Sequence, residues 1–92
     1  MGMPELTAIV AIRVSTQRDL LRIVREVRKG NVIVASLSAF RSLKIRRDIV
    51  RRILEAGKRL RFNILGVGSE FMIIAPERIK IEVGDSDPEP RS

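Results

Sequence analysis

The sequence predicts one α/β domain, a two-layer sandwich in which a mixed sheet of about five strands packs against two helices. First, the chain has 92 residues and 45% hydrophobic content, which suits one small core. Second, two amphipathic helical patterns alternate with short apolar runs. Third, the hydrophobic period of the last third of the chain is that of strands, and three strand-like runs follow one another there. This gives the element order βαβαβββ. The domain is expected at residues 6–83, after a flexible N-terminus (1–5) and before a disordered acidic tail (84–92).

The first half of the chain reads as a strand, a helix and a second strand. Leu6–Val14 is nearly continuous in apolar residues, which favours a strand buried on both faces over an edge strand. Thr16 is expected to cap the helix, with Asp19 in the place of the Glu of a capping box. Gly30 is the expected left-handed end of that helix. Residues 31–37 form the next strand, and short loops join the strand, the helix and this second strand into a βαβ unit. The two strands should therefore be parallel, with a right-handed crossover.

A second amphipathic helix is predicted over Lys44–Lys58. Ile49 and Ile53 lie on its apolar stripe, whereas its charged residues make the outer face one of the two most basic surfaces of the molecule. Ser42 is a plausible N-cap, and Gly57 is expected to mark the end of regular helix.

The last third of the chain predicts three antiparallel strands. They are Arg61–Val67, Glu70–Ala75 and Arg78–Val83, and the last alternates cleanly between charged and apolar residues. Gly68-Ser69 and Pro76-Glu77 separate them as tight turns would.

Composition argues against catalysis and for an anionic partner. The chain has no Cys and no His, so the usual general base and the usual zinc ligands are missing, and we expect no enzyme, no metal and no cofactor. Its net charge of +7 favours acidic partners, although solvated helix faces are the better explanation of the charge taken by itself. The sequence shows no membrane span and no signal peptide, so a cytosolic protein is expected.

Two helices can cover only one face of the predicted sheet. The other face would expose a sizeable apolar patch, because two of the strands are apolar on both sides. A symmetric homodimer is the natural cover, formed sheet to sheet or through the helices. The candidate dimer-interface residues are Ile49, Val50 and Ile53.

The order of these motifs resembles the SepF cell-division protein family, and in particular its archaeal SepF-like members. The resemblance covers roughly residues 9–83. It rests on the strand Val32–Ala35, on Arg51-Arg52-Ile53 in the second helix, on Val67-Gly68, on the apolar strand that runs into Ala75-Pro76, and on Arg78–Ile81.

The resemblance implies a non-enzymatic, dimeric adaptor. Such a protein binds the C-terminal peptide of FtsZ, helps to tether or bundle FtsZ filaments at the division site, and can polymerise further. This sequence departs from the family in lacking the amphipathic membrane-targeting helix and its linker, so we expect it to reach the membrane only through a partner. It also has Glu55-Ala56-Gly57 where bacterial members have Asp-Phe-Leu and a Gly.

The peptide site that the resemblance implies would combine an apolar floor with cationic side chains. Phe71 and Met72 are the candidates for the floor, and Lys44, Arg47 and Arg51 for contacts with acidic peptide side chains. Gly66 occupies a position that is often basic in the family. Each has a structural alternative. One or both of the apolar residues would belong to the core, the arginines would pair with Asp48 and Glu55, and the glycine would serve hairpin geometry.

A nucleic-acid-binding protein of the archaeal Alba type is the alternative function. Such proteins are small, basic and dimeric, with a similar alternation of strands and helices. Three Phe and no Tyr or Trp leave little to stack on bases, but helix charge could still bind phosphates without sequence preference.

Overall fold

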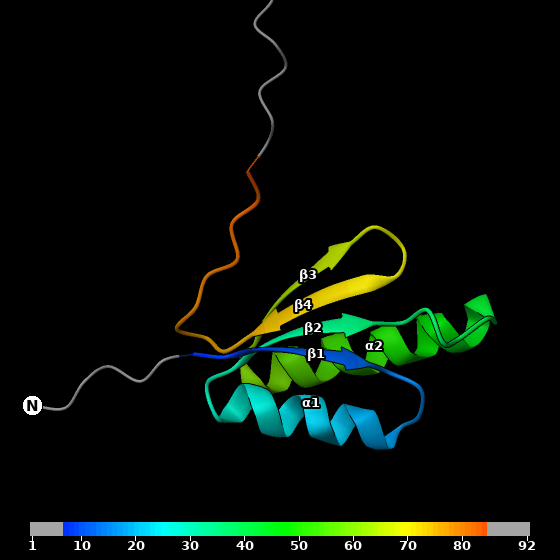
Figure 1. Ribbon diagram of the computed structural model, residues 1–92, viewed down its shortest axis with the longest axis horizontal. Helices are drawn as coiled ribbons and strands as arrows, with labels where there is room; N and C mark the ends of the chain where they lie inside the picture. The colour runs from blue at the N-terminus through cyan, green and yellow to red at the C-terminus, as the bar shows by residue number, and fades with distance from the viewer. Residues whose placement is uncertain (1–6, 85–92) are drawn as a thin grey trace, which may run out of the picture.

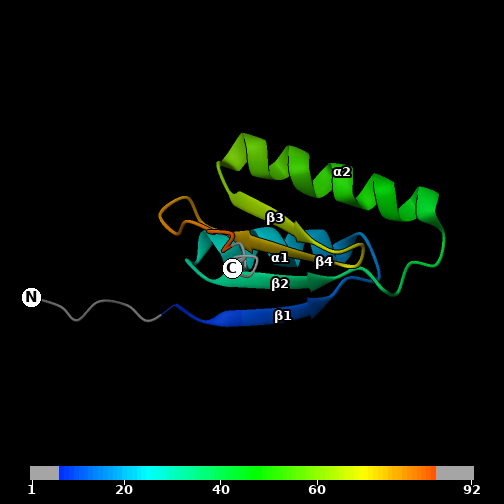
Figure 2. The same ribbon diagram turned by 90° about the horizontal axis from the view of Figure 1, so that it is seen from above.

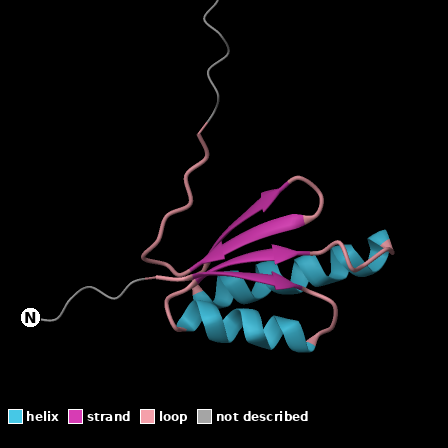
Figure 3. Ribbon diagram, viewed as in Figure 1, coloured by secondary structure: helices cyan, strands magenta, loops and turns pink. Residues whose placement is uncertain are grey.

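The computed structural model describes residues 7–84, and the expectations for the N-terminus and for the acidic tail beyond Gly84 fall outside this range. The chain forms a two-layer α/β fold of order βαβαββ (Figures 1 and 3). Its elements are β1 (Ile9–Arg13), α1 (Arg18–Arg28), β2 (Val32–Ser36), α2 (Leu43–Leu60), β3 (Asn63–Val67) and β4 (Phe71–Ala75).

The sheet has four strands in the order β1-β2-β4-β3. β1 and β2 are parallel, as predicted, and β4 is antiparallel to both β2 and β3. The prediction that β1 is buried on both faces is wrong, because β1 lies at an edge and no described segment covers its second face. Ile12 points into the core, whereas Ile9 is 73% exposed.

The predicted strand Arg78–Val83 does not form in the described part of the chain. Asn63, at the start of β3, donates through Nδ2 to the main-chain oxygens of Pro76 (3.4 Å), Glu77 (3.3 Å) and Ile79 (2.7 Å). These bonds hold the chain in a turn directly after β4. The alternating pattern therefore half-buries Ile79 and Ile81 without adding a fifth strand.

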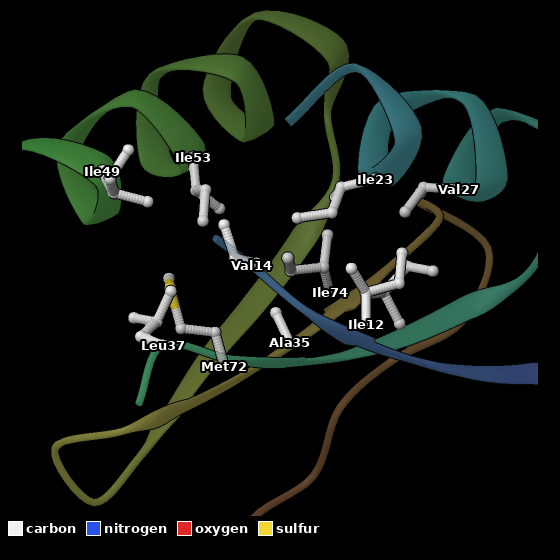
Figure 4. Close-up of a cluster of buried hydrophobic side chains, with 11 residues drawn as sticks. Ile12, Val14, Ile23, Val27, Ala35, Leu37, Ile49, Ile53, Met72 and Ile74 are labelled. Atoms are coloured by element: carbon white, nitrogen blue, oxygen red, sulfur yellow. The ribbon is translucent and has the colours of Figure 1, made fainter. Parts of the chain in front are cut away.

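Both helices pack on one face of the sheet, and the core lies between the two layers (Figure 4). From above, α2 extends past β3, whereas α1 lies nearer to the middle of the sheet (Figure 2). No polar or charged residue of the described chain is fully buried. The core consists of Ile12, Val14, Ile23, Val27, Ile33, Ala35, Leu37, Ile49, Ile53, Met72 and Ile74.

The start of α1 confirms one half of the predicted capping box. The Asp19 carboxylate accepts hydrogen bonds from the main-chain N–H groups of Ser15 (2.8 Å) and Thr16 (3.0 Å). These bonds, with the one from Ser15 the strongest influence, hold the pKa of Asp19 below its ordinary value of 3.8. The prediction that Thr16 is the N-cap is wrong, because Gln17 occupies the N-cap position and makes no side-chain cap bond.

The end of α1 is the predicted glycine terminus. Gly30 adopts φ +99°, and its N–H donates to the carbonyl oxygen of Val27 at 2.9 Å. Asn31 N–H donates to the carbonyl oxygen of Glu26 at 3.1 Å, which completes a Schellman motif.

The prediction for α2 is right at its start and wrong at its end. Ser42 caps the helix by accepting a hydrogen bond from Ile45 N–H at 3.3 Å. Gly57 does not end the helix but lies buried in its last third, against Ile64 of β3. The helix continues to Leu60 and ends at Arg61, which adopts the left-handed conformation with φ 63°.

Candidate functional site

A groove lies between the first half of α2 and the turn that joins β3 to β4. The Ser42 cap fixes where α2 begins, and the hairpin fixes the turn. The groove is lined by Leu43, Arg46, Arg47, Val50 and Ser69. Leu43 is 62% exposed, so the groove offers apolar surface to solvent. We refer to these five residues as the α2–hairpin groove.

Arg46 joins the two walls of the α2–hairpin groove. Its Nη2 donates to the carbonyl oxygen of Phe40 at 2.8 Å and its Nη1 to that of Ser69 at 3.5 Å. Its Nε is buried and has no hydrogen-bond partner in the described structure. Four ion pairs join described residues, and neither Arg46 nor Arg47 takes part in any of them. The groove is therefore both apolar and cationic.

The predicted cationic contacts separate into two places. Arg47 lines the α2–hairpin groove, whereas Lys44 and Arg51 lie beside Ile45 and Asp48 in a shallow depression elsewhere on α2. Arg51 Nη2 lies 3.8 Å from Asp48 Oδ1, and Arg52 Nε lies 3.5 Å from Asp48 Oδ2. The ion-pair alternative therefore describes the position of Arg51, but not that of Arg47.

Phe71 and Met72 do not form one apolar floor, because neighbouring residues of a strand point to opposite faces. Met72 faces the helices, is 4% exposed and belongs to the core. Phe71 lies on the other face, pairs with Val67 of β3 and is 45% exposed. Gly66 pairs with Met72, and no atom lies within 4 Å of where its Cβ would be.

Sequence reasoning missed Leu43, Arg46 and Ser69 as parts of one groove. A signal for the helical wall was available, because Leu43, Val50 and Leu54 recur at intervals of seven and four residues beside the core stripe of α2. No sequence signal placed Ser69 next to that wall.

The face of the sheet opposite the helices is largely apolar, and its exposed apolar side chains include Ile9, Val67 and Phe71. In the strand register, Ala11, Val34, Ile73 and Leu65 form one row across all four strands. Parallel rows on either side contain Ile9, Val32, Val67 and Phe71, and three polar residues, Arg13, Ser36 and Asn63. We refer to this surface as the open sheet face.

The three predicted dimer-interface residues lie on the other side of the molecule. Ile49 and Ile53 are each 4% exposed and pack in the core beneath α2, so a second copy cannot reach them while α2 stays on the sheet. Val50 is half-buried at the edge of the α2–hairpin groove.

The helical layer carries most of the positive charge. Of the eighteen Lys and Arg residues, four lie in α1 and seven in α2. Neither helix is long and apolar enough to cross a membrane. Residues 7–84 contain no cluster of His, Cys, Asp or Glu suited to a metal ion.

Solved structures share this arrangement of strands and helices. A SepF-like protein from Pyrococcus furiosus superposes with a TM-score of 0.77 at 21% identity, covering 88% of this chain and 100% of its own. A SepF-like protein from Archaeoglobus fulgidus gives 0.72 at 25% identity, covering 94% of this chain and 100% of its own. The chain has the archaeal SepF-like fold.

A third similar structure includes a partner. It is the cell division protein SepF from Methanobrevibacter smithii in complex with FtsZ-CTD, with a TM-score of 0.67 and 18% identity over 84% of this chain and 99% of that chain. No family model matches the sequence, and no curated protein is significantly similar to it. The resemblance seen in the sequence is therefore confirmed by the three-dimensional comparison.

Proposed function

We propose that this protein is a SepF-type cell-division adaptor that binds the C-terminal peptide of FtsZ and organises or tethers FtsZ filaments at the division site. It catalyses no reaction in this role. The similar structure in complex with FtsZ-CTD supports the choice of partner. The observation that carries the proposal is the α2–hairpin groove, which combines the exposed side chain of Leu43 and the half-buried Val50 with two arginines that form no ion pair with a described residue.

The groove matches a short peptide that has apolar anchors and acidic side chains. Leu43 and Val50 would cover the anchors, and Arg46 and Arg47 would attract the carboxylates. Lys44 and Arg51 would meet charged residues outside the anchored part of the peptide.

The open sheet face is the proposed homodimer interface. Apolar residues of this face come from all four strands, and a two-fold axis would cover those that are exposed with a second copy of the chain. Phe71 and Ile73 would then contact the partner sheet. The helical layers would face outward, so each dimer would present two grooves and could bridge two FtsZ chains.

A nucleic-acid-binding role is the second candidate, and the charge of the helical layer favours it. Phosphate contacts release counterions, so such binding weakens steeply as salt rises. Binding of a peptide that is held partly by apolar contacts weakens only modestly as salt rises.

The test is fluorescence anisotropy with the labelled FtsZ C-terminal peptide from the same source and, in parallel, labelled duplex DNA, each at low and physiological salt. Saturable micromolar binding of the peptide that persists at physiological salt supports the adaptor. Tight, salt-sensitive binding of DNA without binding of the peptide would contradict the adaptor function and support the nucleic-acid-binding role.

A further inference from the structure

We propose that Arg46 is the specificity-determining residue of the α2–hairpin groove and that it selects a segment in which one carboxylate side chain lies next to apolar side chains. The inference deepens the proposed function and rests on the groove being the peptide site. Arg46 differs from the other cations of α2 in being half-buried and hydrogen-bonded.

The guanidinium of Arg46 has a positive charge that its surroundings do not neutralise. Its described hydrogen-bond partners are the neutral carbonyl oxygens of Phe40 and Ser69. The buried Nε lacks an acceptor, which is unusual because buried donors are nearly always paired. A carboxylate would supply the missing charge, and its two oxygens match the fork of the two Nη groups.

No acidic residue of the described chain forms an ion pair with Arg46. Asp48, two residues along α2, is taken up by Arg51 and Arg52. Glu70 follows Ser69 in the turn but forms no ion pair. Arg47 lines the same groove and adds a second positive charge, so the local field favours an anion.

The hydrogen bond from Arg46 to Ser69 is the weaker of the two that Arg46 makes. At 3.5 Å it lies at the upper limit for a hydrogen bond, whereas the contact with Phe40 at 2.8 Å is short. The strong bond fixes the orientation of the guanidinium, and the weak one can be exchanged for a carboxylate oxygen. Arg46 is thus oriented before binding, which lowers the entropy lost when the peptide docks.

The apolar walls decide which acidic ligand fits. Leu43 and Val50 flank the arginines, so a carboxylate in the groove must be accompanied by apolar side chains that cover them. This favours an acidic and apolar peptide over a nucleic-acid backbone, whose phosphates bring no apolar surface.

Arg46 and Arg47 should therefore behave differently although they are adjacent and both cationic. The side chain of Arg47 is exposed and makes no hydrogen bond with a described residue, so it contributes long-range attraction that salt screens. Arg46 should recognise one particular carboxylate through hydrogen bonds, which salt screens much less.

The test is a double-mutant cycle by fluorescence anisotropy. The protein variants are Arg46→Gln and Arg46→Lys, with Arg47→Gln as the control that removes the same charge one residue along the helix. The peptides are the FtsZ C-terminal peptide and versions in which each Asp or Glu is replaced in turn by its amide. Two unrelated probes, with the cores Leu-Asp-Ile-Leu and Leu-Asn-Ile-Leu, are measured with the same variants. Circular dichroism melts check that each variant is folded at the assay temperature.

We expect one amide replacement to weaken binding to the wild-type protein about tenfold or more. Arg46→Gln should weaken binding of the parent peptide by a similar factor. The affinity of this variant should then be the same for the parent peptide and for the amide version. Arg46→Lys should recover only part of the loss, because an ammonium cannot form the fork. Arg47→Gln should keep the discrimination between acid and amide.

Several results would overturn the inference. Unchanged binding by Arg46→Gln would do so, as would acid-amide discrimination that disappears with Arg47→Gln instead. If the wild-type protein ignores the FtsZ peptide but prefers the Asp probe to the Asn probe through Arg46, the proposed function fails and the inference stands. If FtsZ peptide binding is independent of Arg46, the proposed function stands and the inference fails. Preference for duplex DNA over every peptide would contradict both.

Discussion

Gly57 of α2 lies directly against Ile64 of β3, and a Cβ atom at Gly57 would overlap the side chain of Ile64. The absence of a side chain at this position lets the helix approach β3.

The first prediction concerns this approach. Gly57→Val should lower the free energy of unfolding by about 1–2 kcal/mol, because the added methyl groups overpack the contact. Gly66→Val is the control, since nothing lies within 4 Å of that Cβ and valine favours strands. Urea unfolding of both variants checks the difference, and equal stabilities would show that α2 does not depend on the close contact.

The second prediction concerns the left-handed end of α2. Arg61 adopts φ 63°, which costs a residue with a side chain about 1 kcal/mol. Arg61→Gly should therefore raise the free energy of unfolding by about 0.5 kcal/mol, even though it removes an exposed ion pair with Glu77. Arg59→Gly, inside the helix, should lower it by about 1 kcal/mol. Thermal melts measure the Tm of both variants, and a change of Tm in the same direction for both would contradict this assignment of the helix end.

The third prediction concerns pH. The folded state holds the pKa of Asp19 below 3.8, so the stabilisation from its hydrogen bonds is complete above that pH and is lost as the pH falls through the folded-state pKa. Asp19→Ala should be less stable than the wild type by about 1 kcal/mol at pH 7. The difference should shrink below about pH 4. Urea unfolding at pH 7 and pH 3 measures it, and a constant difference would count against the ionised cap.

The fourth prediction concerns the open sheet face. Ile73→Lys places a charge in the middle of the row formed with Val34 and Leu65, so it should raise the dimer dissociation constant at least about a hundredfold. Leu54→Lys, on the exposed side of α2, should leave the dimer intact. Analytical ultracentrifugation distinguishes the two. A wild-type protein that stays monomeric at high concentration would refute the dimer.

Local signals in the sequence predicted most of the elements correctly. The apolar runs, the helical stripes, Ser42 and Gly30 all mark features that the structure contains. These signals depend on neighbours within a few residues, which is why they can be interpreted without the fold.

The errors arose where distant residues decide. The alternation of Arg78–Val83 is a good strand pattern, but Asn63, fifteen or more positions earlier, holds the chain in a turn before it. Gly57 was predicted to end the helix because glycine is common at helix ends. The structure instead requires a residue without a side chain there because Ile64 of β3 lies against it. The edge position of β1 likewise follows from strand order, which the run of apolar residues does not encode.

The candidate site was predictable only in part. Helical spacing identified a cationic and apolar helix, and Arg47 does line the groove. Ser69 and the half-buried state of Arg46 depend on where the β3–β4 turn meets α2, which no local pattern records.

The most direct test of the groove as the peptide site is a titration of ¹⁵N-labelled protein with the FtsZ C-terminal peptide, followed by NMR. We expect the amide signals of residues around Leu43, Arg46, Val50 and Ser69 to shift in proportion to saturation, and those of Ala11, Val34 and Ile73 on the open sheet face to stay in place. Shifts confined to the open sheet face, or none at millimolar peptide, would contradict this expectation.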